Sequence, residues 1–168
     1  MRVIGGMLKK RRLGSVPGRG TRPTADRLRP RLAQTAAILW GVYALLSAVE
    51  TILLFAGGMS LFDSLCHTFG TMATGGFSTE NASVGAWNSS YIHIVITFFM
   101  FLAGVNFSLH FQALRGKVGS YFRSEEFRFY LGVLAASVLL LFLFNRRVYQ
   151  DPLTNLRDSA FQVASLMT

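Results

Sequence analysis

Three long apolar runs alternate with polar segments along the chain, at residues 35–57, 91–114 and 129–144. The first two contain 23 and 24 residues. At about 1.5 Å per helical residue, both exceed the ~30 Å hydrocarbon core of a bilayer. The third contains 16 residues, which suffices if Arg128 and Asn145 extend their side chains to the interfaces. The pattern predicts three transmembrane helices and an all-α membrane protein.

Between the first two runs, residues 60–73 are moderately apolar, with a helical spacing of large side chains. Ser60 followed by Asp63 forms a pattern typical of a capped helix start. Fourteen residues span only about 21 Å, which is too short to cross a membrane. Because Gly75 and Gly76 are costly within a helix, we expect this helix to end before them.

A short helix between two spanning helices must enter and leave the membrane on one side. Non-helical backbone at membrane depth is tolerated only where protein buries it or where it lines a water-filled path. The carbonyls of a glycine-rich strand in such a path would replace the hydration shell of an alkali cation. The other interpretation is that Gly75 and Gly76 simply end a re-entrant helix in an extracellular loop.

An internal repeat favours the first interpretation. Residues 60–64 read Ser-Leu-Phe-Asp-Ser, and residues 155–159, 95 positions later, read Asn-Leu-Arg-Asp-Ser. We therefore expect Asn155 to cap a second short helix, as Ser60 caps the first. The apolar runs 35–57 and 129–144 lie at nearly the same offset. Transporters and channels use repeated units of this kind to surround one axis.

The formal net charge of +9 is segregated from the apolar runs. Ten of the seventeen Lys and Arg residues lie in residues 1–31, none in 58–90 and four in 115–128. Because cytoplasmic loops are enriched in Lys and Arg, the N-terminus and the 115–128 loop are expected to be cytoplasmic. Arg146, Arg147 and Arg157 depart from this rule. The basic N-terminal segment is interpreted as a solvated tail rather than a nucleic-acid-binding one, since it has no interleaved aromatic residues.

The composition gives no indication of an enzyme or of a cofactor. There is one cysteine, Cys66, and the three histidines have no metal-ligand spacing. The sequence contains no nucleophile–base pair and no phosphate-binding loop. Cys66 and His67 are expected to be packing residues of the short helix.

Three polar residues within the apolar runs are further candidates. Glu50 is costly at membrane depth, so we expect it either to bond the short helix or to line an ion pathway. Asn106 and His110 are expected either to join helices by hydrogen bonds or to line a cavity below the glycine-rich loop.

The chain resembles the Trk/Ktr/HKT superfamily of potassium transporters, and most closely the bacterial Trk- and Ktr-type membrane subunit. The resemblance extends from about residue 28 to 168, and it is strongest in residues 73–79, Ala-Thr-Gly-Gly-Phe-Ser-Thr. Further matching positions are Gly58 to Asp63, His67, Phe69, Gly104, Asn106, Phe107, His110 and Leu156 to Gln162.

This resemblance implies a helix–pore-loop–helix (M1-P-M2) repeat, four of which surround one pore in a full-length member. Residues 32–114 would form one complete unit, with spans 35–57 and 91–114, pore helix 60–73 and filter 74–78. Residues 129–168 would be the first span and pore helix of the next unit, so the chain would be a fragment. The carbonyls of Thr74, Gly75 and Gly76 would bind K⁺, supported by Ala73, Phe77 and Ser78.

The implied function is transmembrane potassium transport in the inner membrane, with the remaining units of the transporter as partners. The family also implies a cytoplasmic nucleotide-binding regulatory subunit, which would dock near residues 1–31 and 115–128. Two alternatives remain open. One is a two-span subunit of a homotetrameric cation channel, and the other is a membrane remnant that transports nothing.

Overall fold

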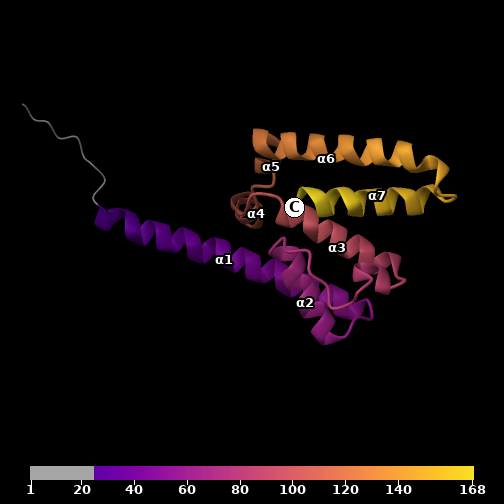
Figure 1. Ribbon diagram of the computed structural model, residues 1–168. Coiled ribbons are helices and arrows are strands. Elements are labelled where there is room, and N and C mark those ends of the chain that lie inside the picture. The colour runs from indigo at the N-terminus through magenta and orange to yellow at the C-terminus, as the bar shows by residue number, and fades with distance from the viewer. Residues whose placement is uncertain (1–24) are drawn as a thin grey trace, which may run out of the picture.

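The computed structural model describes residues 25–168, with side chains from residue 33 onward, and this part of the chain is helical, without a strand. Figure 1 shows the arrangement of its helices. The longer ones are α1 (Ala25–Ala56), α2 (Leu61–Met72), α3 (Ser90–Ala103), α4 (Phe107–Leu114), α6 (Glu125–Phe144) and α7 (Pro152–Met167). The short turns are η1 (Ser83–Ala86), α5 (Ser120–Arg123) and η2 (Asn145–Arg147).

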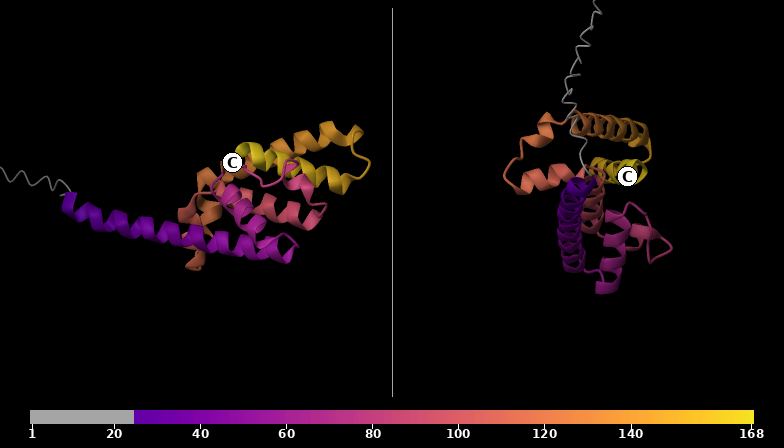
Figure 2. Two further views of the ribbon diagram at one scale, coloured as in Figure 1. Left: turned by 60° about the horizontal axis from the view of Figure 1, so that its bottom comes forward. Right: turned by 90° about the vertical axis from the view of Figure 1, so that its left-hand side faces the viewer.

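Helix α1 begins ten residues before the expected start at 35, and its N-terminal half stands clear of the other helices (Figures 1 and 2). Its segment 33–56 is long and apolar enough to cross a membrane, and so is the segment 125–147 containing α6. The described part of the chain therefore has two such helices, or three if the pair α3–α4 forms one span. Most of the N-terminal segment 1–31 lies outside the described residues.

The short helix expected over residues 60–73 is α2. The Ser60 side chain caps it by accepting a hydrogen bond from the Asp63 amide at 3.1 Å. Helix α2 packs against α1 and α3. The hydroxyls of Thr51 on α1 and Thr68 on α2 are hydrogen-bonded at 3.1 Å, so a polar contact joins these two apolar helices.

The apolar run 91–114 does not form the single helix that its composition predicts. Helices α3 and α4 meet at an angle of 101°, and α4 turns back against α1. The break is built by Asn106, whose side chain accepts a hydrogen bond from the Ser108 amide at 3.0 Å and so starts a new helix. Gly104 lets this corner pack closely, because a side chain there would lie 2.5 Å from the Tyr130 hydroxyl.

Helices α6 and α7 run antiparallel, and α7 packs against both α6 and α3 (Figure 1). The expectation that Asn155 caps α7 is wrong. The cap is Asp151, which accepts hydrogen bonds from the Leu153 and Thr154 amides, with Pro152 in the first helical position. Proline fits this position because its missing N–H would be unpaired there anyway. Asn155 instead lies buried inside α7 and donates to the Phe142 carbonyl of α6 at 3.0 Å.

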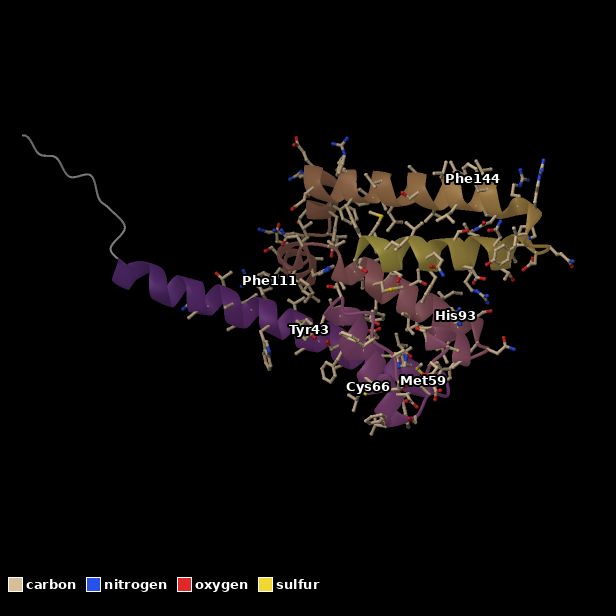
Figure 3. The ribbon with its side chains drawn as sticks, viewed as in Figure 1. Tyr43, Met59, Cys66, His93, Phe111 and Phe144 are labelled. Atoms are coloured by element: carbon tan, nitrogen blue, oxygen red, sulfur yellow. The ribbon has the colours of Figure 1, made fainter. Side chains whose placement is uncertain are left out.

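The apolar core lies among α1, α2, α3 and α7, with Leu54, Met72, Ile92, Phe99 and Ala164 among its members. No residue of α6 is buried, although this helix is strongly apolar. Figure 3 shows the side chains of α6, with Phe144 labelled near its end, and the Phe144 side chain is exposed. A lipid or protein environment is therefore needed on the outer side of α6.

Candidate functional site

The glycine-rich loop follows α2 and folds back along it. Its turn requires left-handed backbone at two positions, with φ of 53° at Thr74 and 68° at Gly76. Gly70 on α2 makes this return possible, because a side chain there would lie only 2.8 Å from the Phe77 carbonyl oxygen. The loop is thus held against the last turns of the helix that precedes it.

The backbone N–H groups of the loop donate hydrogen bonds to carbonyls of α2. Thr74 N–H donates to the Thr71 carbonyl at 3.0 Å, and the amides of Gly75 and Gly76 both donate to the Gly70 carbonyl, at 2.8 and 3.2 Å. In the described part of the chain, the carbonyls of Thr74, Gly75 and Gly76 accept no hydrogen bond. The loop therefore keeps its donors occupied and its acceptors free, as a cation-binding backbone requires.

A cavity of about 180 Å³ lies beside this loop. Its walls come from the loop and α2, from η1 and α3, and from the last turns of α7. Its lining includes Thr74, Gly75, Gly76, Phe77, Ile96, Met100, Phe161, Ser165 and Thr168. Residues nearly one hundred positions apart thus meet at one space.

Helices α2 and α7 both contribute to this cavity. Thr71 and Thr74 line it from the C-terminal end of α2, and Ser165 and Thr168 line it from the α7 side. The C-terminus of a helix carries a partial negative charge. The end of α2 therefore favours a cation without an acidic side chain.

The start of α2 also binds the far end of the loop. The Thr79 hydroxyl donates to one carboxylate oxygen of Asp63 at 2.7 Å, and the Ser60 hydroxyl donates to the other at 2.6 Å. The Ser60 and Thr79 hydroxyls hold the pKa of Asp63 below its usual range, because hydrogen bonds to a carboxylate favour its charged form. Asp63 therefore joins the chain after the loop to the first turn of α2.

His67, one turn further along α2, makes a second connection. Its Nδ1 lies 2.9 Å from the Asp63 carbonyl, which only accepts, so Nδ1 carries the proton. Its Nε2 then accepts from the Ser78 hydroxyl at 3.0 Å. The ring is 3% exposed and meets Trp87 edge to face, with 4.9 Å between ring centroids. His67 was expected only to pack, but it is hydrogen-bonded at both ring nitrogens.

None of the remaining candidate residues lines the cavity itself. Glu50 on α1 is 0% exposed and interacts with the side chain of Thr71 on α2, which does line the cavity, although the geometry of a full hydrogen bond is not reached. Asn106 caps α4 and also donates to Glu126 at 3.5 Å. His110 donates from Nε2 to the Leu102 carbonyl at 2.9 Å and accepts the Tyr121 hydroxyl on Nδ1 at 2.6 Å.

Two parts of the site were missed by sequence reasoning. The hydrogen bonds of Asp63 and His67 to Thr79 and Ser78 depend on the loop folding back, which no local pattern reveals. The approach of Ser165 and Thr168 depends on how α7 packs against α3. Within residues 25–168 there is no cluster of three or more His, Cys, Asp or Glu residues that would hold a metal ion.

Comparison with known proteins gives a consistent family match. The pattern of the TrkH family, described as a cation transport protein, matches residues 22–148. The Trk system potassium uptake protein TrkH of Salmonella typhimurium is 40% identical over 169 residues, covering 98% of this chain and 34% of the relative. The Trk system potassium uptake protein TrkG of Escherichia coli is 36% identical over 117 residues, covering 69% of this chain and 24% of the relative.

A solved structure also matches. The crystal structure of the potassium transporter TrkH from Vibrio parahaemolyticus superposes with a TM-score of 0.76 at 32% identity, covering 82% of this chain and 30% of that one. This chain spans about a third of the length of the TrkH relatives that it matches. The matched relatives are transport proteins by name, in agreement with the expectation of a non-enzymatic membrane protein.

Proposed function

Because this chain belongs to the TrkH family of cation transport proteins, we propose that it forms part of the ion pathway of a potassium uptake protein. The ion-binding groups are the backbone carbonyls of Thr74, Gly75 and Gly76. Ala73, Phe77 and Ser78 hold this filter at its two ends. Potassium is the transported ion, bound only at the filter, and the chain needs no cofactor.

The observation that carries the proposal is the polarity of the loop backbone. Three successive backbone N–H groups donate hydrogen bonds to the carbonyls of Gly70 and Thr71. In the described part of the chain, the carbonyls of the same three loop residues accept no hydrogen bond. These carbonyls belong to residues that border a cavity at the C-terminal end of α2. Unpaired carbonyls and a helix C-terminus both stabilise an alkali cation that has lost its water.

In this proposal the helices form repeated M1-P-M2 units. Helix α1 is the first span, α2 the pore helix and the pair α3–α4 the second span, and α6 and α7 are the span and pore helix of the next unit. The 101° bend between α3 and α4 makes the second span a broken one. The remaining units belong to the rest of the transporter.

The polar residues away from the loop are assigned to helix packing. His110 and Asn106 build the α3–α4 corner through bonds to Leu102, Tyr121 and Ser108. Glu50 is buried on α1 behind Thr71, a residue of the cavity wall, and joins α1 to α2. None of the three is proposed to contact the ion.

The protein is proposed to lie in the inner membrane with its N-terminus in the cytoplasm, following the distribution of Lys and Arg. The 115–128 loop is then cytoplasmic. The relatives are named as members of a Trk system. We therefore propose that a cytoplasmic nucleotide-binding regulatory subunit docks at residues 1–31 and 115–128.

The test is growth rescue of a potassium-uptake-deficient bacterium at low external potassium. Three proteins are compared: this chain, this chain extended along its own gene, and a chimera in which it replaces the matching third of the Escherichia coli TrkH relative. Each is also made as Gly76→Ser. Gly116→Ser is the matched control, because Gly116 also has a positive φ, of 81°, and open space around it, but lies outside the cavity.

We expect the chimera and the extended protein to restore growth, Gly76→Ser to abolish it and Gly116→Ser to retain it. Rescue by this chain alone would mean that several copies assemble into a pore, as in a homotetrameric channel. If Gly76→Ser and Gly116→Ser behave alike in the chimera, the loop is not the filter and the proposal is wrong.

A further inference from the structure

We propose that Asp63 and His67 are positioning residues that latch the outer end of the filter loop to the start of α2, and that this latch sets how well the pathway discriminates among cations. The inference rests on the proposed function of the loop. Neither residue touches the ion. Each acts through the residue that it binds beyond the filter, Thr79 or Ser78.

The latch is needed because the two ends of the loop are held differently. The inner end is fixed by three backbone hydrogen bonds to Gly70 and Thr71. The outer end has no backbone hydrogen bond of this kind, and the Phe77 side chain is 81% exposed. Side-chain hydrogen bonds at Ser78 and Thr79 are therefore what holds the outer end.

The two anchors of the latch, Asp63 and His67, are spaced so that they bind two neighbouring residues of the loop. Asp63 and His67 lie four residues apart, so they occupy one face of α2, and Gly70 continues that face toward the loop. His67 receives Ser78 and Asp63 receives Thr79, so this segment runs antiparallel to the helix. A shift of the segment by one residue would leave at most one of the two anchors facing a hydroxyl, so the two bonds together favour one register of the carbonyls at 74–76.

Asp63, His67 and Ser78 each form further hydrogen bonds besides those that hold the loop. His67 Nδ1–H donates to the Asp63 carbonyl, Ser60 donates to the Asp63 carboxylate, and the Ser78 hydroxyl oxygen also accepts the Glu80 amide at 3.1 Å. The Trp87 ring packs against His67. Since each anchor is itself held, residues 78 and 79 are held in position as well.

One account of ion discrimination is based on such positioning: carbonyls held at fixed spacing coordinate ions of the wrong size less well, whereas a loose loop adapts to them. Releasing the outer end is therefore expected to weaken the preference for K⁺ over Na⁺ without unfolding the helices.

The decisive variant is Thr79→Val, which keeps the side-chain shape, removes one hydroxyl and leaves the Ser60–Asp63 cap intact. Thr154→Val is its matched control, because the Thr154 hydroxyl donates to the cap carboxylate Asp151 at the same distance of 2.7 Å, but on α7. Ser78→Ala removes the contact to His67 and serves as the second test variant.

Two measurements are made on the chimera described above. Uptake competition gives the preference for K⁺ over Na⁺, and hydrogen–deuterium exchange of the purified protein reports the amides of residues 74–76, which donate to α2. We expect Thr79→Val and Ser78→Ala to reduce the preference about two- to tenfold, the range for one lost hydrogen bond. Amide exchange at 74–76 should be faster in both variants. Thr154→Val should change neither quantity.

The proposal is overturned if Thr79→Val matches Thr154→Val in both measurements, or if the loop exchanges faster while the cation preference is unchanged. A chimera that takes up no potassium even without a substitution would instead refute the proposed function. In that case the exchange data still decide whether Asp63 and His67 hold the loop.

Discussion

The two helical hairpins, α1–α2 and α6–α7, are built from a repeated sequence but differ in how they are surrounded. Ser64 and Ser159 occupy the same position of the repeat and are both almost fully buried. Helix α1, however, buries Val42, Glu50 and Leu54, whereas no residue of α6 is buried. The shared pattern thus determines the contact between long and short helix, and the neighbours determine the burial of the long helix.

The hairpins also differ in what their acidic residues do. In the first, Asp63 completes the cap and binds Thr79 beyond the loop. In the second, Asp151 caps α7, and Asp158 is left to pair with Arg157 at 2.8 Å. The aspartate at this position of the repeat therefore binds the loop in the first hairpin (Asp63) and forms an ion pair in the second (Asp158).

The largest effect is expected from adding a side chain where the first hairpin receives its loop. Gly70→Ala would place a methyl group 2.8 Å from the Phe77 carbonyl oxygen, so the loop must move. Overpacking of this kind costs about 1–3 kcal/mol. We expect at least about a fivefold loss of potassium uptake in the chimera.

The second hairpin supplies the comparison, since Ser165 stands 95 positions after Gly70 and a side chain is accommodated there. Gly132→Ala in α6 is the control, because a methyl group there meets nothing within 4 Å. If Gly70→Ala transports as well as Gly132→Ala, the loop does not lie against α2 and the comparison between hairpins fails.

A smaller effect is expected from loosening the second hairpin from α3. Arg157 on α7 donates to the Ser90 hydroxyl at the start of α3 at 2.7 Å, and to Asp158. Of the three arginines that depart from the expected charge distribution, Arg157 therefore has two partners in the structure. Because the pair lies near water, Arg157→Gln should cost less than about 1 kcal/mol.

The measurement is the midpoint of thermal unfolding of the detergent-solubilised protein. Ser90→Ala should lower the midpoint by a similar, small amount, and the double variant should add little, since both remove one contact. Strictly additive losses would mean that Arg157 and Ser90 act independently and do not join α7 to α3.

The sequence predicted local features well and long-range ones poorly. The helix at 60–73 and its cap at Ser60 follow from spacing and capping chemistry that act within one turn. The corner at Gly104 and Asn106 was missed, because a run of 24 residues without Lys, Arg, Asp or Glu suggests a straight span. The real signal was a glycine followed two positions later by a residue that caps helices well.

The error at Asn155 has a similar origin. The repeat alignment favoured Asn155 as the cap, but Asp151 followed by Pro152 is the stronger local signal. In the candidate site, Gly75 and Gly76 stood out in the sequence, whereas the pairs Asp63–Thr79 and His67–Ser78 become neighbours only when the chain turns back. The packing of α7 against α3 likewise depends on contacts that periodicity does not encode.

The smallest effect concerns the pH dependence of the two caps. The Thr154 side chain and backbone hydrogen bonds hold the pKa of Asp151 below its ordinary value of 3.8, and the Ser60 and Thr79 hydroxyls do the same for Asp63. A carboxyl with a lowered pKa stabilises the fold above its ordinary pKa, and this contribution is lost as the pH falls through the lowered value. Both caps should therefore be fully formed from neutral pH down to about pH 5.

Asp151→Ala should lower the unfolding midpoint by a constant small amount over that range, and this difference should shrink only below about pH 4. A difference that already shrinks between pH 7 and pH 5 would mean that the Asp151 carboxylate is not stabilised by its cap. The cap of α7 would then differ from that of α2 in its chemistry as well as in its partners.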